Sequence, residues 1–183
     1  MKGLLLFSAG IDSPVAAHLM QEQGVEVTGL HFNNTDNSIE RVEDLAQKLG
    51  IKLIIIPNKH NQLYIQNKVD PRYHCVICKR FMYRVAEQLA LTKGYDTLIT
   101  GENLGQVASQ TLKNLVVLDK AVKITVLRPL LCYDKEEIVQ LAKKIGTYKI
   151  SIKQKKKCPF LPKHPTTQAN LQKVVEEEKL LHI

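Results

Sequence analysis

Cysteines at Cys-x-x-Cys spacing are the residues of this chain whose arrangement most directly indicates chemistry. Cys75 and Cys78 form the pair, and Cys158 lies far along the chain. Three thiolates suit a [4Fe-4S] cluster with one open iron, for which these cysteines are the predicted ligands. A tetrahedral zinc site needs a fourth ligand, for which His74 and His164 are the candidates.

Other thiol chemistries fit the same cysteines. Cys158 could accept or resolve a persulfide, with Cys75 or Cys78 as the partner in a disulfide relay, and flanking lysines would favour its thiolate. Ordinary reduced thiols are a further interpretation, which a Cys-x-x-Cys pair before a basic helix disfavours. Cys132 lies among apolar residues and is expected to be a small buried hydrophobe. The lysines near Cys158 are Lys153, Lys155, Lys156, Lys157 and Lys163.

A short loop after the first apolar run forms a candidate anion site. Residues 8–13 have the sequence SAGIDS. Backbone N–H groups and the helix dipole favour phosphate at a strand–helix junction, and Ser8 and Ser13 can donate hydroxyl hydrogen bonds. Asp12 cannot bind phosphate directly, so we expect it to hold Mg²⁺. The loop matches neither the Walker A nor the GxGxxG pattern; the alternative is a plain turn in which Ser13 caps the helix.

Alternating strand and helix patterns must position these residues. Short apolar runs rich in β-formers predict strands that are buried on both faces of a sheet. The alternation predicts an α/β fold with a doubly wound, mainly parallel five-stranded sheet, helices on both faces and ligands at the carboxyl ends of the strands. The stretch from 57 to the Cys-x-x-Cys pair is expected to be irregular. Strands are expected at 2–7, 25–32, 51–56, 95–100 and 124–127, and helices at 13–23, 38–49, 79–93, 105–115, 134–145 and 167–181.

Length and composition limit the class of protein. The 183 residues suit a single domain over 1–183, with a basic, Cys-containing tail and a C-terminal helix at about 150–183. The net charge of +8 is a mild bias toward anionic partners such as nucleic acid. Because no apolar run approaches the ~20 residues of a membrane span, we expect a cytoplasmic protein without a membrane partner. Structural disulfides are not expected in that compartment.

Several stretches, in chain order, resemble one known family. The SAGIDS loop is similar to the SGGxDS PP-loop of the N-type ATP pyrophosphatases, with Ala9 where glycine is usual. The other stretches resemble the catalytic domain of the tRNA 4-thiouridine synthase (thiamine biosynthesis-type sulfurtransferase) family over almost the whole chain. They are SPVAA at 13–17, CKRFMYR at 78–84, TGE at 100–102, LGQVASQT at 104–111, LRPL at 127–130, IGTY at 145–148 and Cys158.

The resemblance implies an adenine nucleotide alpha hydrolase-like fold with ATP at the strand ends. Such enzymes transfer AMP to a substrate oxygen, here a uridine carbonyl that sulfur then replaces to give 4-thiouridine. The implied cofactors are ATP, Mg²⁺ and a [4Fe-4S] cluster, and the implied catalytic residues are Asp12, Cys78 and Cys158. The residues implied to bind ATP are Leu6, Phe7, Ser8, Gly10, Ile11, Asp12, Ser13, His31, Phe32, Lys79, Gly101 and Gln110.

Some of these residues also have structural interpretations. Taken alone, His31 and Phe32 suit core packing at a strand end, and Lys79 suits an exposed position. Gly101 would let the backbone approach the nucleotide closely. Arg128 could contact a phosphate or form a structural ion pair.

The partner that the resemblance implies is tRNA. Arg80, Arg84 and the lysines near Cys158 are candidates for contacts with tRNA phosphates. Relatives usually carry ferredoxin-like and THUMP regions, and some a rhodanese domain, so we expect a separate THUMP-type protein and a sulfide or persulfide donor. A homodimer is also expected. The alternatives are an amide-forming PP-loop ligase and a non-catalytic nucleotide-binding or sulfur-carrier module of a larger complex.

Overall fold

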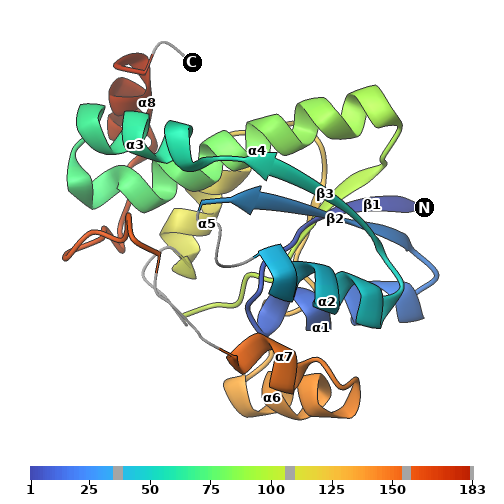
Figure 1. Cartoon of the computed structure of the whole chain (residues 1–183). Helices are drawn as coiled ribbons and strands as arrows, with labels where there is room; N and C mark the ends of the chain where they lie inside the picture. Colours follow the sequence, from blue (N-terminus) through green and yellow to red (C-terminus); the bar gives the residue numbers. More distant parts are fainter. Residues whose placement is uncertain (35–38, 106–109, 154–157, 182–183) are drawn as a thin grey trace.

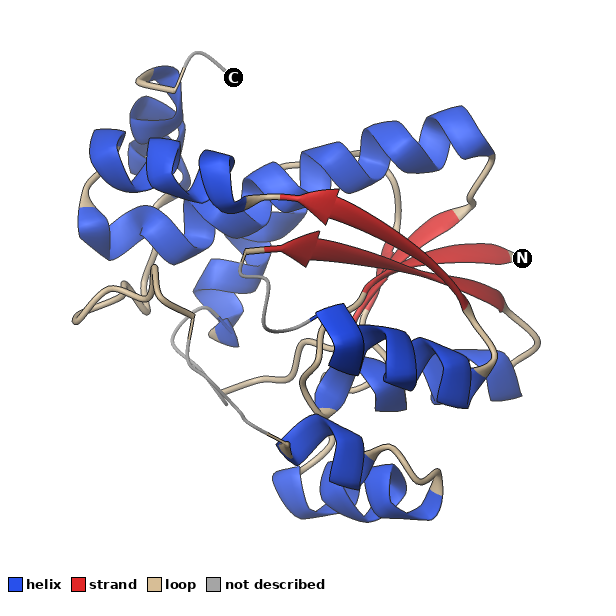
Figure 2. Ribbon diagram, viewed as in Figure 1, coloured by secondary structure: helices blue, strands red, loops and turns tan. Residues whose placement is uncertain are grey.

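Five parallel strands form one sheet in the computed structural model, which describes residues 1–34, 39–105, 110–153 and 158–181. The strand order is β3-β2-β1-β4-β5 (Figure 2). This arrangement confirms the predicted doubly wound α/β fold. The strands are β1 (Lys2–Leu6), β2 (Glu26–Asn33), β3 (Lys52–Pro57), β4 (Thr97–Thr100) and β5 (Val126–Leu127).

Helices cover both faces of the sheet (Figure 1). One layer holds α1 (Asp12–Glu22), α2 (Ile39–Leu49), α6 (Lys135–Lys144) and α7 (Tyr148–Ile152). The other holds α3 (Lys59–Lys68), α4 (His74–Lys93), α5 (Leu112–Asp119) and α8 (Leu171–Lys179). None of the described helices is both long enough and apolar enough to cross a membrane.

The central strand β1 is buried on both sides, which explains its unbroken apolar run. Leu4 packs in the cluster on the α4 side and Leu5 in the cluster on the α1 side, and both are fully buried. Leu6 is in register with Leu30 of β2 and Thr100 of β4, so three strands end in one row. From β1 the chain adds β2 and β3 on one side and then β4 and β5 on the other, so the strand order reverses between β1 and β4. Doubly wound sheets bind ligands at this switch point.

The region before the Cys-x-x-Cys pair differs from the prediction. It is helical, because α3 occupies residues that were expected to be irregular. Asp70 then accepts a hydrogen bond from the Arg72 backbone N–H and begins a short 3-10 helix, η2 (Pro71–Tyr73). This turn leads directly into α4, which starts at His74 rather than at Lys79. Both cysteines of the pair therefore lie within the first turns of α4.

Helix termini follow the predicted caps in some places and not in others. Asp134 caps α6 at the predicted start of that helix, and it forms a capping box with Glu137 that was not predicted. In α1 the cap position is Ile11, and Ser13 does not cap, because its hydroxyl is held by the preceding loop. The short helix α7 was not predicted, and α8 is shorter than expected.

Candidate active site

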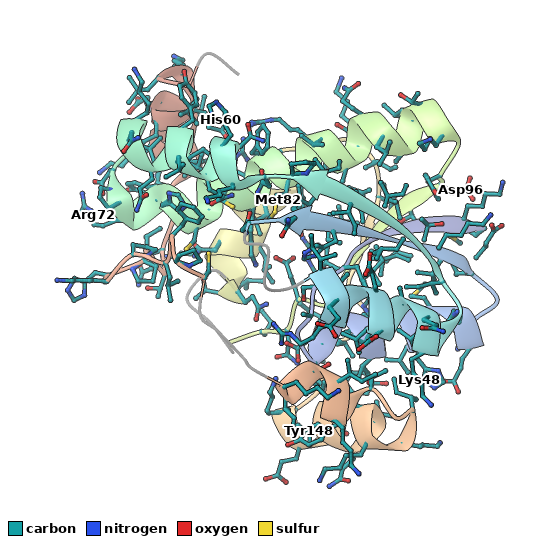
Figure 3. The ribbon with its side chains drawn as sticks, in the orientation of Figure 1. Lys48, His60, Arg72, Met82, Asp96 and Tyr148 are labelled. Atoms are coloured by element: carbon teal, nitrogen blue, oxygen red, sulfur yellow. The ribbon has the colours of Figure 1, made fainter. Side chains whose placement is uncertain are left out.

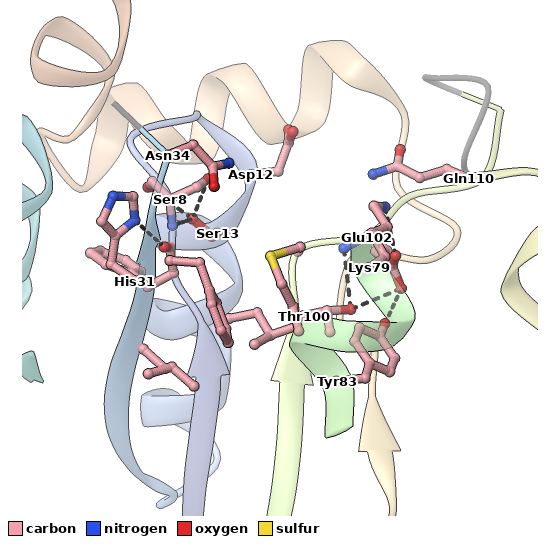
Figure 4. A pocket seen from close by; sticks show the side chains of 16 residues that line it. Ser8, Asp12, Ser13, His31, Asn34, Lys79, Tyr83, Thr100, Glu102 and Gln110 are labelled. Carbon is pink, nitrogen blue, oxygen red and sulfur yellow. Dashed lines mark hydrogen bonds and ion pairs between the residues drawn. The ribbon is translucent and has the colours of Figure 1, made fainter. Parts of the chain in front are cut away.

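A pocket of about 320 Å³ opens at the carboxyl ends of β1, β2 and β4. Leu30 and Met82 are among its apolar lining residues. Its polar residues form two groups, with Ser8 and Ser13 on one side and Lys79, Tyr83 and Glu102 on the other (Figure 4). Met82 is half-buried, whereas Arg72, labelled at the edge of the molecule in Figure 3, is exposed. The residues implied to bind ATP that line this pocket are Leu6, Phe7, Ser8, Asp12, Ser13, His31, Phe32, Lys79, Gly101 and Gln110.

Two residues of the implied ATP site do not line the pocket. Ile11 packs against the hydrophobic core, and Gly10 is not among the lining residues. Sequence reasoning also missed six lining residues. Met82 and Tyr83 had a usable signal, because they follow Lys79 by one helical turn and share its face of α4. The missed residues are Leu30, Asn34, Met82, Tyr83, Thr100 and Glu102.

The loop at 8–13 is closed by hydrogen bonds between its two serines. The Ser8 backbone N–H donates to Ser13 Oγ at 2.9 Å, and Ser13 Oγ donates back to the Ser8 carbonyl at 3.1 Å. The Gly10 N–H donates to Ser8 Oγ at 3.2 Å, and Ser151 of α7 donates to the Gly10 carbonyl at 3.1 Å. The loop is therefore preformed at the N-terminus of α1, where the helix dipole favours an anion.

Asp12, the predicted magnesium ligand, forms an ion pair with a residue that the sequence did not indicate. Lys135 Nζ lies 2.9 Å from Asp12 Oδ1. Lys135 is the first residue of α6, so the capping box at Asp134 fixes the backbone that carries it. The two side chains are 123 positions apart, and only the packing of α6 on α1 brings them together.

Glu102, just after β4, is a buried carboxylate that accepts hydrogen bonds from four side chains beside the pocket, one of them the Thr100 hydroxyl at 3.3 Å. Its Oε1 accepts from Lys79 Nζ at 2.8 Å, and its Oε2 accepts from the Tyr83 hydroxyl at 2.6 Å and from Arg128 Nε at 2.9 Å. Figure 4 shows Lys79 and Tyr83 converging on Glu102. Arg128 also pairs with Asp119 at 2.6 Å. Arg128 thus has the structural ion pairs that were one of its two interpretations.

These neighbours keep Glu102 ionised. Burial alone would raise its pKa, but the charge and hydrogen bond of Lys79, the hydrogen bond of Tyr83 and the charge of Arg128 together lower the pKa from 4.5 to about 2. Burial, followed by the Glu102 charge, raises the pKa of Tyr83, which stays a hydroxyl donor. The network consequently holds the Lys79 ammonium against the pocket wall.

His31, at the end of β2, faces the pocket as a neutral ring. Its Nδ1–H donates to the Phe7 carbonyl at 2.9 Å, which fixes the tautomer because a carbonyl only accepts. Burial lowers the pKa of His31, although the hydrogen bond to the Phe7 backbone acts in the opposite direction. His31 and Phe32 are both buried and both line the pocket. A role in core packing therefore does not exclude a place in the pocket wall.

Gly101 permits a close approach of two backbones. A Cβ at this position would lie 2.8 Å from Ser13 N and 2.9 Å from the Asp12 carbonyl carbon. Residue 101 therefore contacts the first turn of α1 directly. We predicted a close approach to a ligand at this position; the structure shows that the PP-loop helix itself occupies the space a side chain would need.

The three thiols of the predicted cluster lie around the first turns of α4. Cys75 and Cys78 are three residues apart in the helix, so they share one face. Burial, and then the charge of Cys158, raises the pKa of Cys75 to about 11. Burial raises the pKa of Cys78 to about 12, partly against a hydrogen bond from Gln62. Cys158 is close enough for its charge to act on both thiols.

Three thiols are a suitable donor set for a cluster with one open iron, and the pair lies at the N-terminus of α4, where the helix dipole would favour the negative charge of such a cluster. All four cysteines are free thiols. Within the described residues, no three His, Cys, Asp or Glu side chains lie close enough together, as they stand, to hold a metal ion. The predicted zinc ligand His74 is instead bonded through Nε2 to Gln62.

The arginines expected to grip tRNA phosphates have internal partners. Arg80 is 2% exposed, and its Nε lies 2.7 Å from Glu178 Oε1 of α8. Arg84 Nη2 binds the other oxygen of Glu178 at 2.7 Å. Arg80 also donates to the Val117 carbonyl of α5. The expectation for Arg80 was therefore wrong, since a basic residue after Cys-x-x-Cys can face the core when a carboxylate from a distant helix meets it.

Cys132 was predicted to be buried and is exposed. In the turn after β5, Leu130 takes the core position and is fully buried. The Asn103 side chain binds the carbonyls of Leu130 and Tyr133, which holds this turn. Some predictions fall outside the described residues: the Ser38 cap, the QVAS part of the LGQVASQT motif at 106–109, and Lys155, Lys156 and Lys157 beside Cys158.

Comparisons with known proteins agree in both sequence and structure. The protein-family model described as "Thiamine biosynthesis protein (ThiI)" matches residues 1–183. A "Probable tRNA sulfurtransferase" of Caldanaerobacter subterraneus is 43% identical over 189 residues, covering 97% of this chain and 50% of that protein. One of Moorella thermoacetica is 40% identical over 193 residues, covering 100% of this chain and 50% of that protein.

A solved structure is similar over nearly the whole chain. It is described as a "4-thiouridine synthetase - RNA complex with bound ATP", is 36% identical and superimposes with a TM-score of 0.94 over 99% of this chain and 50% of that chain. The present chain spans about half the length of the curated relatives it matches. Because the family model covers every residue, the chain belongs to the thiamine biosynthesis protein (ThiI) family.

Proposed function

We propose that residues 1–183 form the catalytic domain of an ATP-dependent tRNA sulfurtransferase that replaces a uridine carbonyl oxygen with sulfur and makes 4-thiouridine. The observation that carries the proposal is the double use of α4. Lys79 lines the pocket, whereas Cys75 and Cys78, just before it in the same helix, are two of the three cysteines predicted to hold a cluster. An activated oxygen and its replacing sulfur must meet at one carbon, so the two sites have to adjoin.

The names of related proteins support this proposal. The similar solved structure is described as a 4-thiouridine synthetase bound to RNA and ATP, and the curated relatives are named probable tRNA sulfurtransferases. The alternative of an amide-forming ligase is disfavoured, because its chemistry does not need Cys75, Cys78 and Cys158. We propose a separate THUMP-type protein as the source of further tRNA contacts, and a homodimer as the assembly.

The pocket fits ATP in its volume and in the chemical character of its lining residues. Its volume is within the range of small-molecule sites. Leu30, Phe32 and Met82 offer an apolar surface for the base, and the preformed loop at 8–13 offers the helix N-terminus for the phosphates. Mg²⁺ on Asp12 would neutralise phosphate charge.

The first step forms an adenylate. A uridine carbonyl oxygen attacks the α phosphorus of ATP, the bond to the β-phosphate oxygen breaks, and pyrophosphate leaves with the electron pair. Lys79, held by Glu102, and Lys135 supply positive charge beside the phosphates. Asp12 would hold Mg²⁺, and Lys135 would then contact the departing phosphates instead of Asp12.

The second step exchanges oxygen for sulfur. Hydrosulfide attacks the activated carbon, AMP leaves with the oxygen, and no change of oxidation state is needed. A [4Fe-4S] cluster on Cys75, Cys78 and Cys158 would supply an open iron site for that sulfide. The raised pKa values of Cys75 and Cys78 disfavour free thiolates as resting nucleophiles, which favours sulfide over a persulfide on these two residues.

The test is nucleoside mass spectrometry of tRNA incubated anaerobically with iron- and sulfide-treated protein, ATP, Mg²⁺ and sulfide. We expect 4-thiouridine that forms only with ATP, with one AMP released for each sulfur inserted. AMP and pyrophosphate release without a thiolated nucleoside would contradict the substrate assignment. A complete lack of turnover, alone and with a THUMP-type partner, would contradict the enzyme assignment and favour a non-catalytic module.

A further inference from the structure

A buried glutamine contacts the sulfur of Cys78. Gln62 comes from α3, and its Nε2 donates to Cys78 Sγ at 2.7 Å. Its Oε1 accepts from His74 Nε2 at 3.0 Å. Gln62 is fully buried, and an amide is costly to bury unless its polar atoms have partners. Both of its side-chain partners belong to the turn that carries the Cys-x-x-Cys pair.

The same chain of contacts continues to the third cysteine. His74 is 3% exposed and stacks on Phe160, with ring centroids 6.3 Å apart and planes inclined by 18°. Phe160 follows Cys158 by two residues and is buried. Among the described residues, His74 Nδ1 is the buried side-chain nitrogen or oxygen without a hydrogen-bond partner. Its Nε2–H donates to Gln62, so Nδ1 carries an acceptor lone pair.

We propose that Gln62 is a positioning residue for the Cys78 sulfur, that His74 orients its amide, and that the stacking of His74 on Phe160 places the Cys158 segment beside the pair. This inference rests on the sulfur-centre role of Cys78 in the proposed function. Hydrogen bonds in a chain polarise one another, so the His74 N–H strengthens the Gln62 N–H toward sulfur. Groups that bond to a metal-binding sulfur fix its orientation and tune the bound metal.

The first test needs no metal and follows the Gln62 side-chain amide by NMR in reduced protein. We expect its protons to be protected from solvent exchange and to shift when Cys78→Ala removes the acceptor. The amide of Gln66, which is exposed on the same helix, is the internal control and should not shift. An unprotected Gln62 amide, or one insensitive to Cys78→Ala, overturns the proposal whether or not the protein binds iron.

The second test compares Gln62→Met with Gln66→Met after anaerobic treatment with iron and sulfide. Both variants replace a glutamine of α3 with methionine, but only Gln62→Met removes a hydrogen-bond donor to sulfur. We expect Gln62→Met to release iron to a chelator at least tenfold faster than the wild type, in line with groups that support metal ligands. We also expect a more negative reduction potential, because an N–H donor stabilises the electron-rich reduced cluster.

A third variant separates the hydrogen bond from packing. Gln62→Glu keeps the shape and the acceptor for His74 but replaces the donor to sulfur, so it should match Gln62→Met in iron release. Equal iron release and equal potential in all variants would overturn the proposal. If the wild-type protein binds no iron, the cluster in the proposed function fails, and the NMR result alone decides the positioning role.

Discussion

Charge at single residues around the pocket is arranged before any phosphate is present. In the loop at 8–13 the N–H groups of Ser8 and Gly10 donate to the hydroxyls of Ser13 and Ser8, and Asp12 is paired with Lys135. Ligand binding therefore exchanges existing partners rather than ordering free side chains, which reduces the entropy that binding costs. Lys135 and Glu102 are the residues at which this exchange can be measured.

Replacing Lys135 with glutamine should slow pyrophosphate release about 100-fold or more, because one preorganised positive contact to developing charge is lost. The matched control is Lys144→Gln, an exposed lysine of the same helix. Pyrophosphate release under saturating ATP and tRNA measures the effect. Equal rates in both variants would remove Lys135 from the chemistry.

Glu102 should make the stability of the protein depend on acid. Its folded pKa is lowered, so its contribution is present above the unfolded value of 4.5 and is lost as the pH falls toward about 2. The size of the shift corresponds to roughly 3 kcal/mol. Urea denaturation from about pH 6 downward should show the wild type losing its advantage over Glu102→Gln. Parallel stability curves for the two proteins would contradict this role.

At the scale of elements, contacts between helices and strand ends fix the site. The end of β4 touches the first turn of α1 at Gly101, and α8 is bound to α4 through Glu178. Neither contact involves a ligand, yet each holds a pocket-lining or thiol-bearing helix against its neighbour. Substitutions at these two positions test that dependence.

Gly101→Ala should weaken ATP binding at least tenfold while the protein stays folded. The added methyl would meet backbone atoms of Asp12 and Ser13, which cannot move without shifting the loop. A shift of about 1 Å at a reacting group is enough for a large loss. Calorimetric titration of ATP measures the affinity, and circular dichroism checks the fold. Unchanged affinity would mean that β4 gives way instead of α1.

Glu178→Gln should lower the free energy of unfolding by about 3–5 kcal/mol, because it leaves a buried arginine without a counter-charge. Arg80 is the side chain affected, since it is almost fully buried. Glu176→Gln, an exposed position of the same helix, should change little. Chemical denaturation of both variants measures the difference. A similar loss in both would point to helix propensity rather than to the ion pair.

Local pattern was enough for the sheet, for the PP-loop and for α6, whose caps and apolar spacing lie close together in sequence. It failed for α3, where a polar sequence buries only Gln62 and Ile65 within the helix. It also failed for the pairs of Asp12 with Lys135 and of Arg80 with Glu178, 123 and 98 positions apart. Such partners depend on how helices pack, which single-residue preferences do not contain.

For the whole molecule, the sheet order decides that nucleotide and thiol chemistry are neighbours. The crossover after β3 brings α4 to the face beside β1, so one helix reaches both the pocket and the Cys158 segment. Under the proposed function, the two half-reactions use different residues within one framework. They should be separable by substitution.

Cys158→Ala should stop sulfur insertion and leave pyrophosphate release within about twofold of the wild type, since Cys158 does not line the pocket. The matched control is Cys132→Ala, because Cys132 is also exposed but is not one of the three predicted cluster ligands. Parallel assays of pyrophosphate and of 4-thiouridine measure the two half-reactions. Continued thiolation by Cys158→Ala would exclude this residue from sulfur transfer.

The ion pairs of Glu178 with Arg80 and Arg84 have a consequence for the order of events during translation. The SAGIDS loop, β1 and β2 emerge from the ribosome early and can pair at once. The carboxylate that pairs with Arg80, from Glu178, is synthesised about a hundred codons later. A nascent chain that ends before α8 leaves Arg80 without this counter-charge, so α4 can reach its final packing only after α8 has been made.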